Sequence, residues 1–212
     1  VNLVARFYQP GSGAIVMNGT DYRRFPLLEL QSRFGIVSQT PQLFSGTILE
    51  NIRYGRLQAS DDEVMAVAEQ VNATHFIRDL KDGFNTLIGE GGSRLSTGQK
   101  QLISLARALL SDPDVFILDE ATSSIDTETE QLIQSAIEQA FHGRISFVVA
   151  HRLSTIRSAS QILVIDEGEI IEQGNHAELL AKNGRYYRLY HNQFKTELDS
   201  RMREEIDNLS GR

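Results

Sequence analysis

The sequence contains no cysteine and no long apolar run. Without cysteine, the chain has no disulfide scaffold, no thiolate metal site and no cysteine nucleophile. Its longest apolar runs, such as residues 115–118 and 147–150, fall far short of the roughly 20 residues that span a bilayer, so we expect no membrane-spanning segment. Positive charge is also scarce: 21 Lys and Arg stand against 28 Asp and Glu, a formal net charge of −7. This balance argues against a nucleic-acid partner, which requires a basic face.

The residues that are present fit an ordinary globular protein. The chain has 212 residues, of which 41% are hydrophobic. This length allows one compact domain, or one domain with an inserted lobe. The absence of cysteine is compatible with a reducing compartment.

Strand and helix patterns alternate along the chain. Short runs rich in β-branched and aromatic residues predict strands at 14–17, 34–37, 115–118, 145–149, 162–165 and 169–172. Helical spacing and end signals predict helices after Ser60, at 99–110, at 127–141 and from 184 onward. This order favours an α/β fold with a largely parallel sheet. Residues 40–110 carry no convincing strand pattern and predict a helical lobe inserted between two strands of the sheet.

Polar residues follow three of the predicted strands. Asp119 and Glu120 end the apolar run VFIL, which reads as a strand buried on both faces. Ligands of open α/β sheets bind at this carboxyl edge, where one acid could hold Mg²⁺ and the other could act on a water. The alternative is a cap for the following helix. Gln39 and His151 follow two other strands and, taken singly, read as loop residues. Together the four indicate phosphoryl transfer without a covalent nucleophile.

A glycine-rich stretch, GEGGSRLSTGQ, precedes the predicted helix at 99–110. Free N–H groups and the positive dipole end of such a helix bind anions, and Ser96 could add a hydroxyl to a phosphate oxygen. The alternative is a turn with Ser96 or Thr97 as an ordinary N-cap.

Several motifs in this order resemble the nucleotide-binding domain of ABC transporters, and phrases such as LFSGTILENIRYG and GNHAELL resemble the exporter (multidrug and lipid type) subfamily. LSTGQ resembles the LSGGQ signature with Thr at the third place, and VFILDEATSSID resembles the Walker B strand with its catalytic glutamate and D-loop. Gln39 resembles the Q-loop glutamine, and His151 the switch histidine. The matching residues are Leu95, Ser96, Thr97, Gly98 and Gln99 in the signature, Ser123, Ser124, Ile125 and Asp126 in the D-loop, and Gly89, Glu90, Gly91 and Gly92 in the X-loop.

The resemblance implies a P-loop NTPase (RecA-like) core with an inserted helical subdomain, and ATP and Mg²⁺ as cofactors. It implies that Glu120 and His151 act on the attacking water, that Asp119 and Gln39 serve Mg²⁺, partly through water, and that the signature binds an ATP held by a second nucleotide-binding domain. The partners implied are this second domain, as homo- or heterodimer, and a transmembrane domain. The implied location is the cytoplasmic face of the cell membrane.

One motif of the family is missing: no G-x-x-x-x-G-K-[S/T] phosphate loop occurs in the sequence. Residues 1–10 resemble the helix that follows this loop in the family, so we expect a fragment that lacks the phosphate loop and the first strands, exposes apolar surface and is inactive alone. The expected domains are a core at 1–39 and 111–194, a helical subdomain at 40–110 and a charged tail at 195–212.

Two other functions remain open. The chain could belong to an ABC-type ATPase that drives no transport, although tandem cassettes and coiled-coil insertions are not visible. It could also be a non-catalytic module that contributes only the signature half-site in trans.

Overall fold

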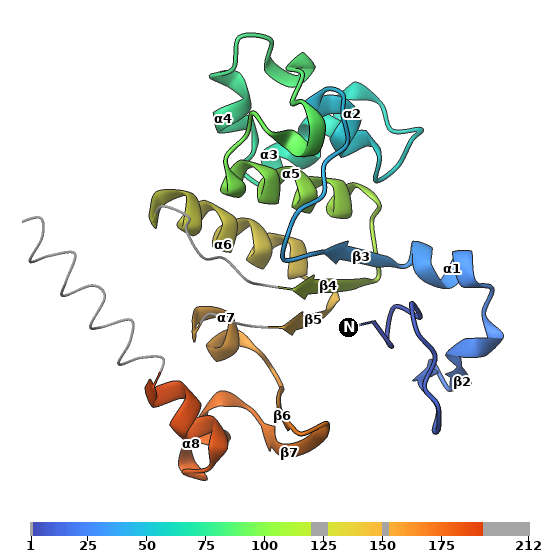
Figure 1. The fold of residues 1–212 in the computed structure, drawn as a ribbon, viewed down its shortest axis with the longest axis vertical. Helices are drawn as coiled ribbons and strands as arrows, with labels where there is room; N and C mark the ends of the chain where they lie inside the picture. The colour runs from blue at the N-terminus through green and yellow to red at the C-terminus, as the bar shows by residue number, and fades with distance from the viewer. Residues whose placement is uncertain (1, 120–126, 150–152, 193–212) are drawn as a thin grey trace, which may run out of the picture. The chain divides into compact units, whose positions relative to one another are not determined.

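Three parallel strands form the central sheet: β3 (Phe34–Val37), β4 (Val115–Asp119) and β5 (Ile145–Val149), in the order β3-β4-β5. The computed structural model describes residues 2–119, 127–149 and 153–192. The chain divides into two compact units, residues 1–149 and 150–212, and the sheet belongs to the first (Figure 1). The register pairs Val37 with Leu118 and Asp119 with Val149, which confirms the predicted α/β fold with parallel strands.

Strand β4 is buried on both faces, as its sequence predicts. Phe116 and Leu118 join the core formed with α5 (Thr97–Leu110) and α6 (Thr127–Phe141), which cover one face of the sheet (Figure 1). Val115 and Ile117 point to the other face and pack with residues from the first 34 positions, including Ala5 and Tyr22. This alternation follows from the two-residue period of a strand.

Strand β5 presents an apolar row on the face that α5 and α6 do not cover. Ile145, Phe147 and Val149 are 63%, 46% and 42% exposed. The expected apolar surface on the sheet is therefore present. Ser146 and Val148 alternate with these residues, and Val148 packs against the core under α6.

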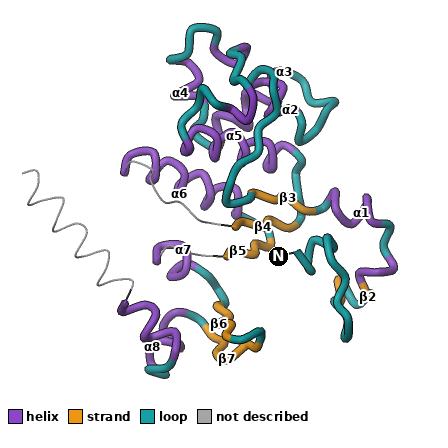
Figure 2. The backbone as a smooth tube through the Cα atoms, viewed as in Figure 1, coloured by secondary structure: helices purple, strands orange, loops and turns teal. Residues whose placement is uncertain are grey.

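Between residues 40 and 110 the chain forms helices, as predicted. They are α2 (Ile48–Arg53), α3 (Asp61–Gln70), α4 (Thr74–Arg78), the 3-10 turns η2 (Gly83–Asn85) and η3 (Glu90–Gly92), and α5. Figure 2 shows helices and loops in this lobe and no strand. The only β pairing in this described stretch is an isolated bridge between Thr47 and Leu87. The Ser60–Glu63 capping box is confirmed: the Ser60 hydroxyl accepts from the Glu63 N–H, and the Glu63 carboxylate accepts from the Ser60 N–H.

A small hairpin precedes the sheet. β1 (Val16–Met17) and β2 (Thr20–Asp21) pair antiparallel across Asn18 and Gly19, and η1 (Tyr22–Arg24) and α1 (Leu27–Ser32) follow. Positive φ angles of 48° and 76° at Asn18 and Gly19 fit the tight turn that such a pair favours. The strand is shorter than the 14–17 expected, because pairing with β2 stops at Val16.

The first residues correct a second expectation. Residues 2–6 form a turn and residues 7–8 a bend, so the expected helix at 1–10 is limited to a single turn. The N–H of Phe7 bonds to the Asn2 carbonyl and the N–H of Arg6 to the Leu3 carbonyl, which is the Schellman pattern that ends a helix. Arg6 has φ 57° at the position where glycine is usual, and this left-handed conformation stops helical propagation.

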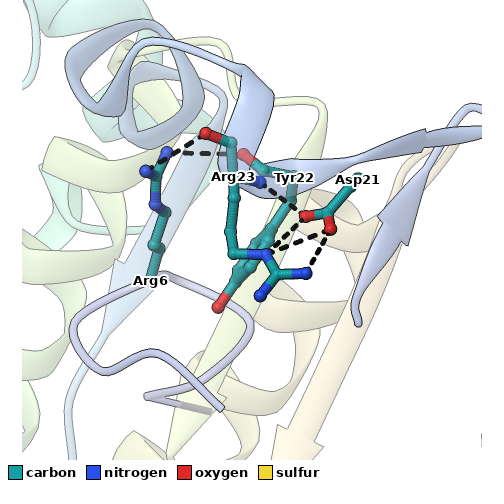
Figure 3. Close-up of polar contacts among 4 residues, drawn as sticks. All are labelled: Arg6, Asp21, Tyr22 and Arg23. Atoms are coloured by element: carbon teal, nitrogen blue, oxygen red, sulfur yellow. Dashed lines mark hydrogen bonds and ion pairs between the residues drawn. The ribbon is translucent and has the colours of Figure 1, made fainter. Parts of the chain in front are cut away.

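Arg6 is held in this conformation by carbonyl oxygens (Figure 3). Its guanidinium donates to the carbonyls of Phe25 at 2.7 Å, Tyr22 at 3.3 Å and Arg23 at 3.4 Å, and it lies 5.7 Å from the Tyr22 ring centre. Beside it, Arg23 makes a forked contact with Asp21, and these hydrogen bonds lower the pKa of the Asp21 carboxyl to about 2. Arg6 therefore fastens the first turn of the chain to residues 22–25.

We expect Arg6→Ala to lower the unfolding free energy of the chain by about 2 kcal/mol, because hydrogen bonds from a charged donor are lost while the left-handed conformation stays costly. Arg6→Gly removes the same bonds but relieves the backbone, so its loss should be smaller by about 1 kcal/mol. Urea unfolding of both variants measures this difference. An Arg6→Gly variant less stable than Arg6→Ala would contradict the assigned role of the backbone.

The second unit contains α7 (Leu153–Ser158), the antiparallel pair β6 (Ile162–Asp166) and β7 (Glu169–Gly174), α8 (His176–Ala181) and a helix at 185–192. The turn at residues 166–168 is confirmed, with positive φ at Glu167 and Gly168. Glu172 accepts from the N–H groups of Arg185 and Tyr186, which lowers the pKa of its carboxyl. Within the described ranges, no helix combines the length and the apolar character that crossing a bilayer requires.

Candidate functional site

The carboxyl edge of the sheet carries two of the predicted site residues. Asp119 is the last residue of β4, and Gln39 lies two residues beyond β3, the neighbouring parallel strand. Asp119 is half-buried, and Gln39 is exposed. Parallel strands end at one edge, so the topology brings these two residues to the same rim, as expected. Glu120, His151 and the D-loop residues Ser123, Ser124, Ile125 and Asp126 lie outside the described residues.

The signature residues begin helix α5. Ser96 is the N-cap: its hydroxyl oxygen accepts from the Gln99 N–H at 3.2 Å, and the Gln99 side chain accepts from the Ser96 N–H at 3.0 Å. Both Ser96 and Thr97 are exposed, whereas Leu95 and Gly98 are buried. A hydroxyl can accept and donate at the same time. Ser96 can therefore donate its own proton to a phosphate oxygen without giving up the cap.

The charge at this helix start differs from that of the other capped helices. Four described helices begin with a capping box, and the third helical residue is Glu50 in α2, Glu63 in α3 and Glu178 in α8. In α5 it is the neutral Gln99, and the first turn of α5 contains no acidic residue. A carboxylate would satisfy the positive end of the helix dipole internally. Its absence leaves the N-terminus of α5 able to attract an external anion.

The X-loop in front of the signature is a tight, glycine-dependent turn. Gly89, Gly91 and Gly92 all have positive φ, which side chains rarely adopt. The N–H groups of Gly92 and Leu95 bond to the carbonyls of Gly89 and Gly92. A Cβ at Gly92 would lie 2.9 Å from a methyl carbon of Leu43, so the X-loop packs closely on the segment that follows Gln39. Glu90 is exposed at the surface of this turn.

The residues present fit Mg²⁺ and a nucleotide phosphate. Proteins usually bind Mg²⁺ through one or two carboxylates, and phosphate oxygens and waters complete the shell. Asp119 supplies one such carboxylate at the strand end. No group of three or more His, Asp or Glu residues that could cage an ion is found within 2–119, 127–149 and 153–192.

The described candidate site residues form two groups. Gln39 and Asp119 lie on the sheet edge, and residues 89–99 lie in the helical lobe. Among the residues that the structure describes, no hydrogen bond or ion pair joins the first group to the second.

Two polar residues to which the sequence analysis gave no role hold the lobe together. Asn51 is 2% exposed, and Arg107 donates to its backbone and side-chain oxygens. A sequence signal existed for both. Asn51 interrupts the apolar stripe that Ile48 and Ile52 form on α2, and Arg107 is the single charge in the run ISLARALL. Polar residues on buried faces are uncommon unless they are paired.

Comparisons with known proteins agree with this geometry. Residues 1–123 match the family described as ABC transporter. The chain is 52% identical to the ABC transporter ATP-binding protein YfiC of Bacillus subtilis (strain 168), over 92% of this chain and 32% of that protein. It is 48% identical to the ATP-dependent lipid A-core flippase of Syntrophus aciditrophicus (strain SB), over 93% of this chain and 33% of the flippase. The chain thus spans about a third of the length of these relatives.

A solved structure shows the same fold. The structure of a bacterial Atm1-family ABC exporter with ATP bound superposes with a TM-score of 0.84 and 41% identity, covering 91% of this chain and 34% of that one. The likeness supports a P-loop NTPase fold for the parallel sheet and its helices. The family match covers more than half of the sequence, and among the described motif residues Asp119 ends β4 and Ser96 caps α5. The chain belongs to the ABC transporter family.

Proposed function

We propose that this chain is the ATP-binding and ATP-hydrolysing module of an exporter, in which ATP-driven pairing of two such modules is coupled to transport through a transmembrane domain. The observation that carries the proposal is the N-terminus of α5, where the exposed Ser96 hydroxyl accepts the capping hydrogen bond and the first turn has no acidic residue. This start of a helix is suited to a phosphate.

In the proposed mechanism each module contributes half of a site. Ser96 and the first N–H groups of α5 bind the γ-phosphate of an ATP held mainly by the second module, and residues 123–126 cross between the modules. Asp119 would hold Mg²⁺, partly through water, and the ion, when bound, would offset charge on the phosphate oxygens. Glu120 takes the proton of the attacking water. His151 would contact the γ-phosphate and the water, and Gln39 would contact the water and help to hold the ion.

The same proposal extends to the parent protein. ATP closes the pair of modules, hydrolysis reopens it, and the motion passes to the transmembrane helices. Gln39 and the X-loop at residues 89–92 lie on the path to the membrane domain. The proposed division is a core at 1–39 and 111–194, a helical subdomain at 40–110 and a charged tail at 195–212. The proposed location is the cytoplasmic face of the cell membrane.

One observation favours a second function for the 212-residue chain by itself. The sequence has no G-x-x-x-x-G-K-[S/T], the motif whose backbone and lysine cradle the phosphates of a bound nucleotide. A chain without this motif would contribute its signature residues to the binding of an ATP that another module holds.

Two measurements test these proposals. The purified parent protein should release phosphate from Mg-ATP, because it would combine the half-sites of two modules. By calorimetry, the 212-residue chain alone should bind Mg-ATP only weakly, at millimolar concentration or not at all. A parent protein without turnover would refute the ATPase proposal, and micromolar binding by the isolated chain would refute its dependence on another phosphate loop.

A further inference from the structure

Residues 42–47, the segment that follows Gln39, are fixed to the helical lobe by one buried asparagine. The Asn51 side chain accepts from the Phe44 N–H at 2.9 Å and donates to the carbonyls of Phe44 and Thr47, both at 2.9 Å. Both amide hydrogens of Asn51 are therefore used. Three contacts to one short segment, made from a residue that is 2% exposed, are a rigid attachment.

Arg107 of α5 also holds this segment. Its Nε and Nη2 donate to the backbone and side-chain oxygens of Asn51 at 2.8 and 2.9 Å, and its Nη1 donates to the Gln42 carbonyl at 2.8 Å. The guanidinium lies 5.1 Å from the ring centre of Phe44 and 5.8 Å from that of Tyr54. Burial lowers the pKa of Arg107. In the part of the chain that the structure describes, carbonyl dipoles and ring faces, not a carboxylate, surround this charge.

These contacts link two functional elements that are distant in sequence. Asn51 and Arg107 are 56 positions apart, and Arg107 lies on the helix whose first residue follows Ser96. Residues 42–47 begin three positions after Gln39 and also touch the X-loop, where Leu43 packs against Gly92. We call Asn51 and Arg107 together the Asn51–Arg107 bracket.

We infer that the Asn51–Arg107 bracket positions the segment after Gln39 on the signature helix, so that Gln39 at the sheet edge and Ser96 on α5 respond to nucleotide together. Neither Asn51 nor Arg107 is placed at the reacting atoms. Both are therefore positioning residues, which act through Gln39 and Ser96. The inference rests on the proposed ATPase function, because coordination of Gln39 with Ser96 matters only where both serve one catalytic cycle.

Hydrogen exchange tests the attachment without nucleotide. In Asn51→Ala, the Phe44 amide should exchange about tenfold faster or more, since it loses its acceptor within a charge-assisted network. In Asn51→Asp its exchange should be intermediate, because the carboxylate still accepts from Phe44 and pairs with Arg107 but cannot donate to the carbonyls of Phe44 and Thr47. Val64→Ala is the control: Val64 is a fully buried residue of α3 outside the bracket, and its loss lowers stability without releasing residues 42–47. Equal exchange at Phe44 in Asn51→Ala and Val64→Ala would overturn the inference.

Kinetics of the parent protein test the positioning role. Asn51→Ala and Arg107→Lys should lower kcat for ATP about tenfold and leave KM within about twofold, because the nucleotide contacts themselves remain. Arg107→Lys keeps the positive charge but loses the planar guanidinium that donates to Gln42 and Asn51 at once. This variant replaces Asn51→Ala as the test if Asn51→Ala does not fold. Asn51→Asp should recover part of the turnover, and Val64→Ala should change neither constant while folded.

The results separate the two proposals. A changed exchange rate at Phe44 with unchanged kcat would reduce the bracket to a structural role and overturn the inference. Absence of turnover in the wild-type parent protein would overturn the proposed function, and that result is distinguished because it involves no bracket variant.

Discussion

Replacing Glu120 by glutamine in the parent protein should lower ATP turnover by about a hundredfold or more, the scale expected for loss of a general base. Glu120 directly follows Asp119, which ends a strand buried on both faces at the edge where α/β sheets bind ligands. Glutamine has nearly the same shape but cannot take a proton from water. Nucleotide binding should persist, so kcat falls while the affinity for Mg-ATP changes little.

The matched control for this substitution is Glu138→Gln on the exposed side of α6. It removes the same charge from the same unit and should leave turnover unchanged. Phosphate release measures kcat for both variants, and calorimetry measures Mg-ATP binding. Wild-type turnover in Glu120→Gln would show that another group takes the proton, and the assignment of Glu120 would be wrong.

Gln99→Glu should have opposite effects on stability and activity. A glutamate at this position keeps the capping box, as Glu50, Glu63 and Glu178 do in three other helices. It also places a negative charge at the positive end of α5, which should raise the unfolding free energy by about 0.5 kcal/mol. The same charge repels an approaching phosphate. Two unit charges about 5 Å apart near a protein surface interact by roughly 3 kcal/mol, so turnover of the parent protein should fall about a hundredfold.

The control for Gln99→Glu is the reverse exchange in another capping box. Glu63→Gln in α3 alters the charge of a helix start for which no phosphate is proposed, so it should reduce stability slightly and leave turnover unchanged. Thermal unfolding and phosphate release measure the two effects. If Gln99→Glu retained full turnover, the N-terminus of α5 would not be a phosphate site.

Much of the fold could be predicted because short segments of the chain carry strong local signals. The strands at residues 34–37 and 145–149 have the predicted bounds, and the turns at Asn18-Gly19 and at residues 166–168 adopt positive φ as their sequences favour. Capping at Ser60 follows from four consecutive residues. Such features depend on backbone conformation and hydrogen bonds within one turn, so neighbours in sequence are sufficient to specify them.

The first residues show where local reasoning fails. Residues 2–8 resemble a helix in sequence, yet Arg6 takes a left-handed conformation. The carbonyl groups that stabilise it belong to residues 22–25, and sequence alone does not show that these residues come within reach. The candidate site also combines features that the sequence predicts with features that only the structure shows. The motifs identify Ser96 and Asp119 as candidates, but only the structure shows that the Ser96 hydroxyl oxygen accepts from the Gln99 N–H and caps α5.

By itself, the sequence determined the family and the order of the strands and helices along the chain, and it nominated the residues proposed to carry the chemistry, because each depends on contiguous motifs. The tertiary structure alone decided that the segment after Gln39 is attached to the signature helix. That attachment is made by Asn51 and Arg107, whose hydrogen bonds join positions 56 residues apart. A buried charge needs partners, but only the packing of α2 on α5 determines which carbonyl groups those partners are.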